Sequence, residues 1–99
     1  MTKTDKKRDT QIIKQLKSVC NEFKHSINEF EYISHEVNFK QLNQSLNISI
    51  YLSNDSAISA LNLSEQKHAV SMVVSSLKEI AITLTDPAKQ IHWRVKSER

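Results

Sequence analysis

The chain has 99 residues, with one cysteine, no glycine, 38% apolar and 25% charged residues, and a formal net charge of +3. These values are those of one ordinary globular domain, and they exclude an internal disulfide, a multi-cysteine metal motif and the standard glycine-rich loops that bind phosphate. No apolar run approaches the roughly 20 residues of a transmembrane helix, so a membrane-spanning protein is not expected.

The first predicted element is a helix over residues 5–27, which Thr4 or Asp5 is expected to cap. Its apolar side chains recur at helical spacing and form one stripe: Ile12, Leu16, Val19, Cys20, Phe23 and Ile27. Residues 1–8 are expected to fray, because three consecutive cations there oppose the helix dipole. Cys20 lies on the stripe and is interpreted as a small buried hydrophobe rather than a nucleophile.

Two strands are predicted next, over residues 30–39 and 45–52, because apolar and polar residues alternate in both segments. The five-residue link between them predicts an antiparallel hairpin. Since the chain has no glycine, turns that need a positive φ are expected to use Asn or Asp. His35 interrupts an apolar strand face and is interpreted as a hydrogen-bonded core or rim histidine, although a functional role stays open.

The second half of the chain predicts a short helical piece over residues 57–61 and a kink near Asn62. A longer helix is then expected over residues 64–84, with Ser64 as its N-cap. Its apolar stripe comprises Val70, Val73, Val74, Leu77, Ile80, Ala81 and Leu84. Alternation from Ile91 to Val95 predicts a third strand. Together these elements predict a single α+β domain over residues 1–99, a two-layer sandwich of order α-β-β-α-β with a three-stranded sheet and helices on one face.

The other face of this sheet is the candidate binding face, because no predicted element covers it. Alternation places aromatic, histidine and arginine side chains there, namely Tyr32, Tyr51, His92 and Arg94. Charge is concentrated at both ends of the chain, at +4 over residues 1–24 and +3 over residues 89–99, around a middle of −4. The basic ends supply the candidate phosphate contacts Lys6, Lys7, Arg8 and Lys96.

The opening Lys6-Lys7-Arg8-Asp9, followed by Ile12, Leu16 and Val19-Cys20, resembles a family of short bacterial proteins that open on a "KKRD…L…VC" pattern. The middle hairpin and the residues 91–98 (IHWRVKSE) resemble the same family, so the likeness covers most of the chain. Some of its members are labelled "Fis family transcriptional regulator", but a helix-turn-helix is not predicted here. The resemblance implies no activity and no functional residues. The element order also loosely resembles KH-like and BolA-like domains, although the glycine loop of KH domains is missing.

No catalytic signature is found in the sequence, so we expect no enzyme, no cofactor and no small-molecule substrate. The four histidines are scattered without metal-ligand spacing, and no metal site is expected. The leading hypothesis is a small interaction module that acts through its open sheet face or edge, as a homodimer. The alternative is a weak RNA- or DNA-binding protein that uses the basic termini and sheet aromatics. The charged N-terminus lacks the apolar segment of a secretory signal, so a cytoplasmic location and no membrane partner are expected.

Overall fold

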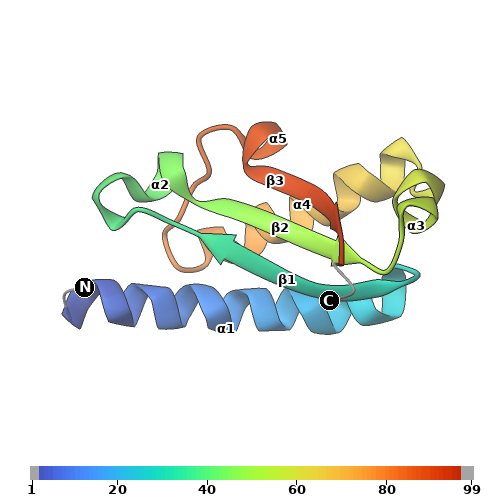
Figure 1. The fold of residues 1–99 in the computed structure, drawn as a ribbon. Coiled ribbons are helices and arrows are strands. Elements are labelled where there is room, and N and C mark those ends of the chain that lie inside the picture. The colour runs from blue at the N-terminus through green and yellow to red at the C-terminus, as the bar shows by residue number, and fades with distance from the viewer. Residues whose placement is uncertain (1–2, 97–99) are drawn as a thin grey trace.

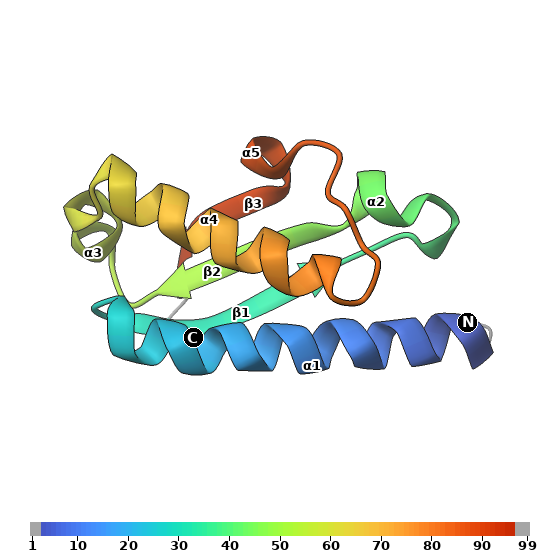
Figure 2. The ribbon, with the colours of Figure 1, turned by 180° about the vertical axis from the view of Figure 1, so that it is seen from behind.

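A three-stranded sheet forms one layer of the molecule, and helices form the other (Figures 1 and 2). The computed structural model describes residues 3–96. In chain order its elements are α1 (Lys3–Ser26), β1 (Phe30–Glu36), the 3-10 helix η1 (Phe39–Gln41), α2 (Leu42–Ser45), β2 (Asn47–Leu52), α3 (Asp55–Ala60), α4 (Leu63–Lys78), α5 (Pro87–Gln90) and β3 (Ile91–Val95). The predicted α+β fold and its order are therefore confirmed. α3 corresponds to the short helical piece predicted over residues 57–61, and η1, α2 and α5 are short additional helices.

The strands lie in the order β1-β2-β3, with β2 in the centre. The first two strands pair antiparallel, as the predicted hairpin requires, and β3 pairs parallel with β2. A parallel pair cannot be joined by a tight turn, so the chain crosses over through α3, α4 and α5 before it returns as β3. The crossover brings α4 across one face of the sheet, while α1 runs along β1 and packs against α4 (Figure 2).

The core lies between this helical layer and the inner face of the sheet. Four alternate residues of the central strand segment are fully buried: Leu46, Ile48, Ile50 and Leu52. They pack with the predicted stripe of α1, of which Cys20 is only partly buried, and with Ala69, Val73 and Leu77 of α4. Since each such aliphatic side chain contributes about 1.5–3 kcal/mol when it leaves water, this alternation determines which face of the sheet points inward.

The expected extension of the long helix to Leu84 is wrong, because α4 ends at Lys78. The Ala81 amide donates to the Lys78 carbonyl and the Ile82 amide to the Leu77 carbonyl, which is the bond pattern of a Schellman motif. Ala81 has a φ of 63°, the left-handed conformation that this motif requires. Burial of Ile82 against the core favours this sharp stop over another helical turn.

The expectation that Asn or Asp supplies the positive-φ turns is also wrong. Among the described residues, Glu29 and Ala81 have positive φ, each at 63°. Glu29 lies in the link between α1 and β1, where its carbonyl accepts a hydrogen bond from the Ser53 amide at 2.9 Å. These two left-handed conformations are therefore determined by contacts with the rest of the fold. The intrinsic preference of the residue type does not determine them.

The link between the first two strands is longer than the five residues that we expected, because η1 and α2 lie within it. Asn38 caps η1 through its side chain, which accepts from the Lys40 amide at 3.0 Å. The Ser45 hydroxyl donates to the Asn38 carbonyl and accepts from the Asn38 amide, each at 2.8 Å. These bonds hold the link in a compact turn. Phe39 and Ser45, which were expected at the ends of the two strands, therefore lie in η1 and α2 instead.

The predicted N-caps of the two long helices are wrong. Asn62, not Ser64, caps α4 in a reciprocal capping box with Glu65. The described part of α1 begins at Lys3, so Thr4 and Asp5 lie inside the helix; residues 3–8, expected to fray, are helical, and Met1 and Thr2 lie outside the described residues. No helix within residues 3–96 is both long and apolar enough to span a bilayer.

Candidate functional site

The four residues predicted for the candidate binding face lie together on the outer face of the sheet. Tyr32 is the register partner of Tyr51, and Tyr51 is that of Arg94, so these three side chains form one row across the strands. His92 lies two residues before Arg94 on β3, beside Ser49. The tyrosine rings are stacked, with centroids 4.5 Å apart and planes 15° from parallel. Each ring thus has at most one face left for a ligand.

A shallow polar hollow of about 420 Å³ lies beside this row, and its lining residues are Ser34, Glu36, Asn47, Ser49, Tyr51, His92 and Arg94. Four of its polar side chains already form two pairs between β2 and β3. Arg94 Nε donates to Ser49 Oγ at 3.1 Å, and His92 Nε2 lies 3.2 Å from Asn47 Oδ1. The hollow offers a cation for a polar ligand, but the Glu36 carboxylate opposes an anion.

The candidate phosphate contacts are not brought together. Lys6, Lys7 and Arg8 lie on α1 in the helical layer, where the next residue, Asp9, contacts His35 near the end of β1. Lys96 instead follows β3 and contacts Glu31 near the start of β1. The two groups of cations therefore lie near opposite ends of β1. In Figure 1 the start of α1 lies beside the end of β1, whereas β3 ends near the start of β1. The two groups do not line one continuous path over the outer face.

Lys96 takes part in a polar cluster around Glu31. Its Nζ lies 3.0 Å from Glu31 Oε1, and Ser53 Oγ donates to Glu31 Oε2 at 2.7 Å. The Ser53 hydrogen bond, followed by Lys96, lowers the pKa of the Glu31 carboxyl below its ordinary value. The cluster joins the start of β1 to the ends of β2 and β3. The side chains of Glu31, Ser53 and Lys96 therefore already have partners within the fold.

A second surface, which sequence reasoning missed, is an apolar groove of about 540 Å³ between α4 and the β3 edge of the sheet. We call it the β3-edge groove, and its lining residues are Leu63, Gln66, Lys67, Val70, Ser71, Val74, Pro87, Ala88, Ile91 and Trp93. Leu63 is 66% exposed at its rim. The signal in the sequence is a second stripe on α4, in which Leu63, Val70 and Val74 lie beside the buried stripe at helical spacing.

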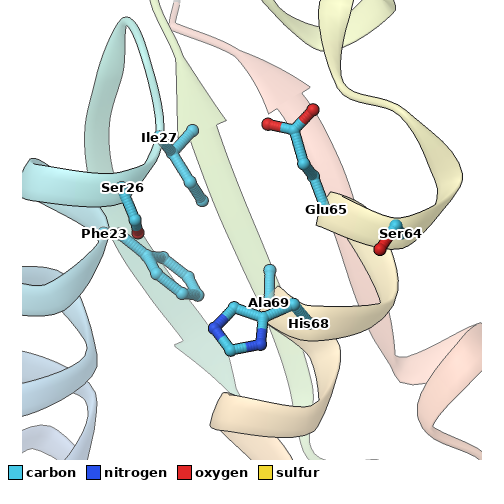
Figure 3. A pocket seen from close by; sticks show the side chains of 7 residues that line it. All are labelled: Phe23, Ser26, Ile27, Ser64, Glu65, His68 and Ala69. Carbon is cyan, nitrogen blue, oxygen red and sulfur yellow. The ribbon is translucent and has the colours of Figure 1, made fainter.

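A smaller cleft of about 370 Å³ lies where the end of α1 meets the start of α4 (Figure 3). Phe23, Ile27 and Ala69 form its apolar part. Its nearby polar groups are used by the helices, because Ser26 donates to the Glu22 carbonyl at 3.0 Å and Glu65 belongs to the capping box. In Figure 3 the Glu65 carboxylate points away from the His68 ring, so these side chains do not converge on a common point.

Cys20 and His35 both interact with neighbouring parts of the fold. Desolvation by burial raises the pKa of the Cys20 thiol, which lowers the thiolate fraction that nucleophilic chemistry needs. His35 Nε2 lies 2.8 Å from Asp9 Oδ1 and so joins β1 to α1. Within residues 3–96, no group of three or more His, Cys, Asp or Glu side chains is arranged to hold a metal ion.

The sequence matches no protein-family model, no curated protein and no solved structure. The outer face of the sheet and the β3-edge groove are therefore the features that bear on function.

Proposed function

We propose that this chain is a small, non-enzymatic interaction module that self-associates through the open β3 edge of its sheet. The single observation that carries the proposal is the β3-edge groove. It places apolar side chains of α4 and β3 beside a strand that has a partner on one side only, within the described residues. An unpaired strand edge offers backbone donors and acceptors, and an adjacent apolar groove favours a partner that removes both from water.

The two edges of the sheet differ in how open they are to pairing. At the β1 edge, the register shifts between Phe30 and Tyr32, and the strand carries Glu31 and Glu36. Irregularities and charged side chains are the common means by which proteins block unwanted strand pairing. β3 has a regular register with β2 from Ile91 to Val95 and no carboxylate. The β3 edge is thus the one suited to a partner.

Nucleic-acid binding is the second candidate, and the row of Tyr32, Tyr51 and Arg94 on the outer face favours it. Aromatic rings on an open sheet can stack bases, and an arginine can meet a phosphate. Three features make this face less suited to a nucleic acid. The tyrosines stack on each other, Glu36 adds a negative charge, and the two groups of cations lie apart. We therefore place self-association first.

The test is the solution mass of the protein by light scattering over a range of protein concentrations. Each sample is measured at low and at moderate salt, with and without a mixed pool of RNA and DNA oligonucleotides. We expect a mass that rises to a dimer with protein concentration and does not depend on the pool. A monomer at every concentration contradicts self-association. A monomer that binds the oligonucleotides and releases them as salt rises supports the second candidate.

A further inference from the structure

We infer that two copies of the chain join antiparallel through β3, with Trp93 on the two-fold axis, and form one continuous six-stranded sheet. The inference rests on the proposed function and names the occupant of the β3-edge groove as the second copy.

The backbone of β3 presents alternate residues to the open edge. The Lys96 amide donates to the Leu52 carbonyl at 2.8 Å, within a parallel register that pairs Leu52 with Val95. In a parallel ladder the residues that bond to one neighbour alternate, so the amides and carbonyls of His92 and Arg94 face β2. Those of Trp93 and Val95 consequently point away from β2, toward the open edge.

Ile91 differs from these two residues in one respect. Its amide donates to the Pro87 carbonyl at the end of α5, which leaves its carbonyl for the edge. A second β3 strand can therefore form two hydrogen bonds between Trp93 and its own copy. It can form two more from the Val95 amide of each chain to the Ile91 carbonyl of the other.

Charge favours this register over the neighbouring one, in which the two-fold axis passes through Arg94. One register places Trp93 opposite Trp93 of the second copy, with Ile91 opposite Val95 and His92 opposite Arg94. The neighbouring register places Arg94 opposite Arg94 on the outer face, and like charges directly opposite each other destabilise a strand pair. In the register centred on Trp93, the inner face of each β3 strand is apolar. Trp93 meets its own copy there, and Ile91 meets Val95 of the second copy.

The β3-edge groove supplies the apolar surface for this pairing. Ile91 and Trp93 lie on the inner face of the sheet and line the groove with Val70 and Val74 of α4. In the selected register, the Trp93 side chain of the second copy enters the same layer beside Trp93. Val95, which is 37% exposed, comes to lie next to Ile91 of the second copy. Pairing therefore closes the open side of the groove in both chains at once.

A residue on a two-fold axis faces its own copy, and this permits a charge-complementation test. Trp93→Glu and Trp93→Lys are prepared separately and then mixed, and the solution mass of each sample is measured by light scattering. We expect wild type to be a dimer, each variant to be a monomer because two like charges meet at the axis, and the mixture to regain the dimer mass. Arg94→Glu, mixed with wild type, is the control for the neighbouring register and is expected to form no more dimer than wild type does.

A backbone variant tests the same geometry without a charge. Val95→Pro removes an amide that points to the open edge, a position where a strand tolerates proline. Val95→Ala is the matched control, because it shortens the side chain and keeps the amide. We expect Val95→Pro to retain the circular dichroism spectrum of the fold and to lower the dimer affinity at least tenfold more than Val95→Ala does. If the Trp93 variants fail to fold, Val95→Pro still tests whether two copies pair through β3.

Failure of the inference can be distinguished from failure of the proposed function. A wild-type dimer that persists in the folded Trp93→Glu, Trp93→Lys and Val95→Pro variants overturns pairing through β3, while self-association through another surface stands. A dimer restored only by mixing Arg94→Glu with wild type overturns the Trp93 register. A wild-type chain that is monomeric at every concentration overturns both.

Discussion

Gln90 and Leu46 are joined by a buried hydrogen bond of 2.9 Å from Gln90 Nε2 to the Leu46 carbonyl oxygen. The same Nε2 donates to the Asn43 carbonyl at 2.8 Å, and Gln90 Oε1 accepts from the Asp86 amide at 2.6 Å. One buried side chain thus joins α5 to the start of β2. It fixes the point from which β3 begins and gives the buried Leu46 carbonyl a hydrogen-bond donor.

Replacing Gln90 by leucine is expected to lower the free energy of unfolding by about 2–4 kcal/mol, because leucine keeps most of the volume but leaves the buried Leu46 carbonyl and the partly buried Asn43 carbonyl without this donor. Urea denaturation followed by circular dichroism measures the change. Gln44→Leu is the matched control, since Gln44 is exposed and its replacement should change stability by less than about 0.5 kcal/mol. Equal effects of the two substitutions would refute the role assigned to Gln90.

Ala81→Gly is expected to stabilise the protein by about 0.5–1 kcal/mol. An L-residue with a Cβ pays a steric cost in the left-handed region, and glycine does not, although glycine loses more chain entropy on folding. The increase in stability should raise the melting temperature by several degrees in a domain of this size. Ser71→Gly, within α4, is the control and is expected to lower the melting temperature. A drop with Ala81→Gly would show that the side chain has a role beyond its backbone conformation.

Ser53→Ala is expected to raise the pKa of Glu31 toward its ordinary value, because the Ser53 hydrogen bond is the largest cause that lowers it. A group whose pKa is lowered by folding contributes stability above its unfolded pKa, and this contribution is lost as pH falls through the folded pKa. The stability difference between wild type and variant should therefore be larger at neutral pH than near about pH 2, where the loss of the 3.3 Å bond from Ser53 Oγ to the Glu29 carbonyl is what remains. An NMR titration of the Glu31 side chain measures the shift. Ser75→Ala, on the exposed side of α4, should leave that titration unchanged.

The faces of β2 and β3 could be predicted from the sequence, because alternation has a period of two and one face must be buried. Ile48 and Ile50 therefore point inward, and Tyr51 points to the candidate binding face. In β1 the prediction of an outward Phe30 is wrong, because the register shift between Phe30 and Tyr32 turns Phe30 toward the core. Which strands are neighbours could not be predicted in this way. Alternation assigns a residue to a face and says nothing of the strand beside it, so the parallel pairing of β3 with β2 had to come from the structure.

The ends of the helices depended on contacts that the local sequence does not specify. The apolar spacing continues past Lys78, but burial of Ile82 beside Leu77 ends α4 through an alanine in the left-handed region. The β3-edge groove was missed for a related reason. Val70 and Val74 belong to the predicted buried stripe and Leu63 has no predicted role, and only the placement of β3 beside them makes these residues part of a surface.

The parallel pairing of β2 and β3 has a consequence for how the chain acquires its fold. The β1–β2 hairpin consists of contacts between neighbouring segments, whereas β3 reaches β2 only after α3, α4 and α5 have been traversed. Contacts of such large sequence separation form slowly, so β3 is expected to dock last. Until then β2 has an open side of its own, and the β3 strand of another molecule can occupy it. Refolding at high protein concentration therefore competes with domain-swapped assembly.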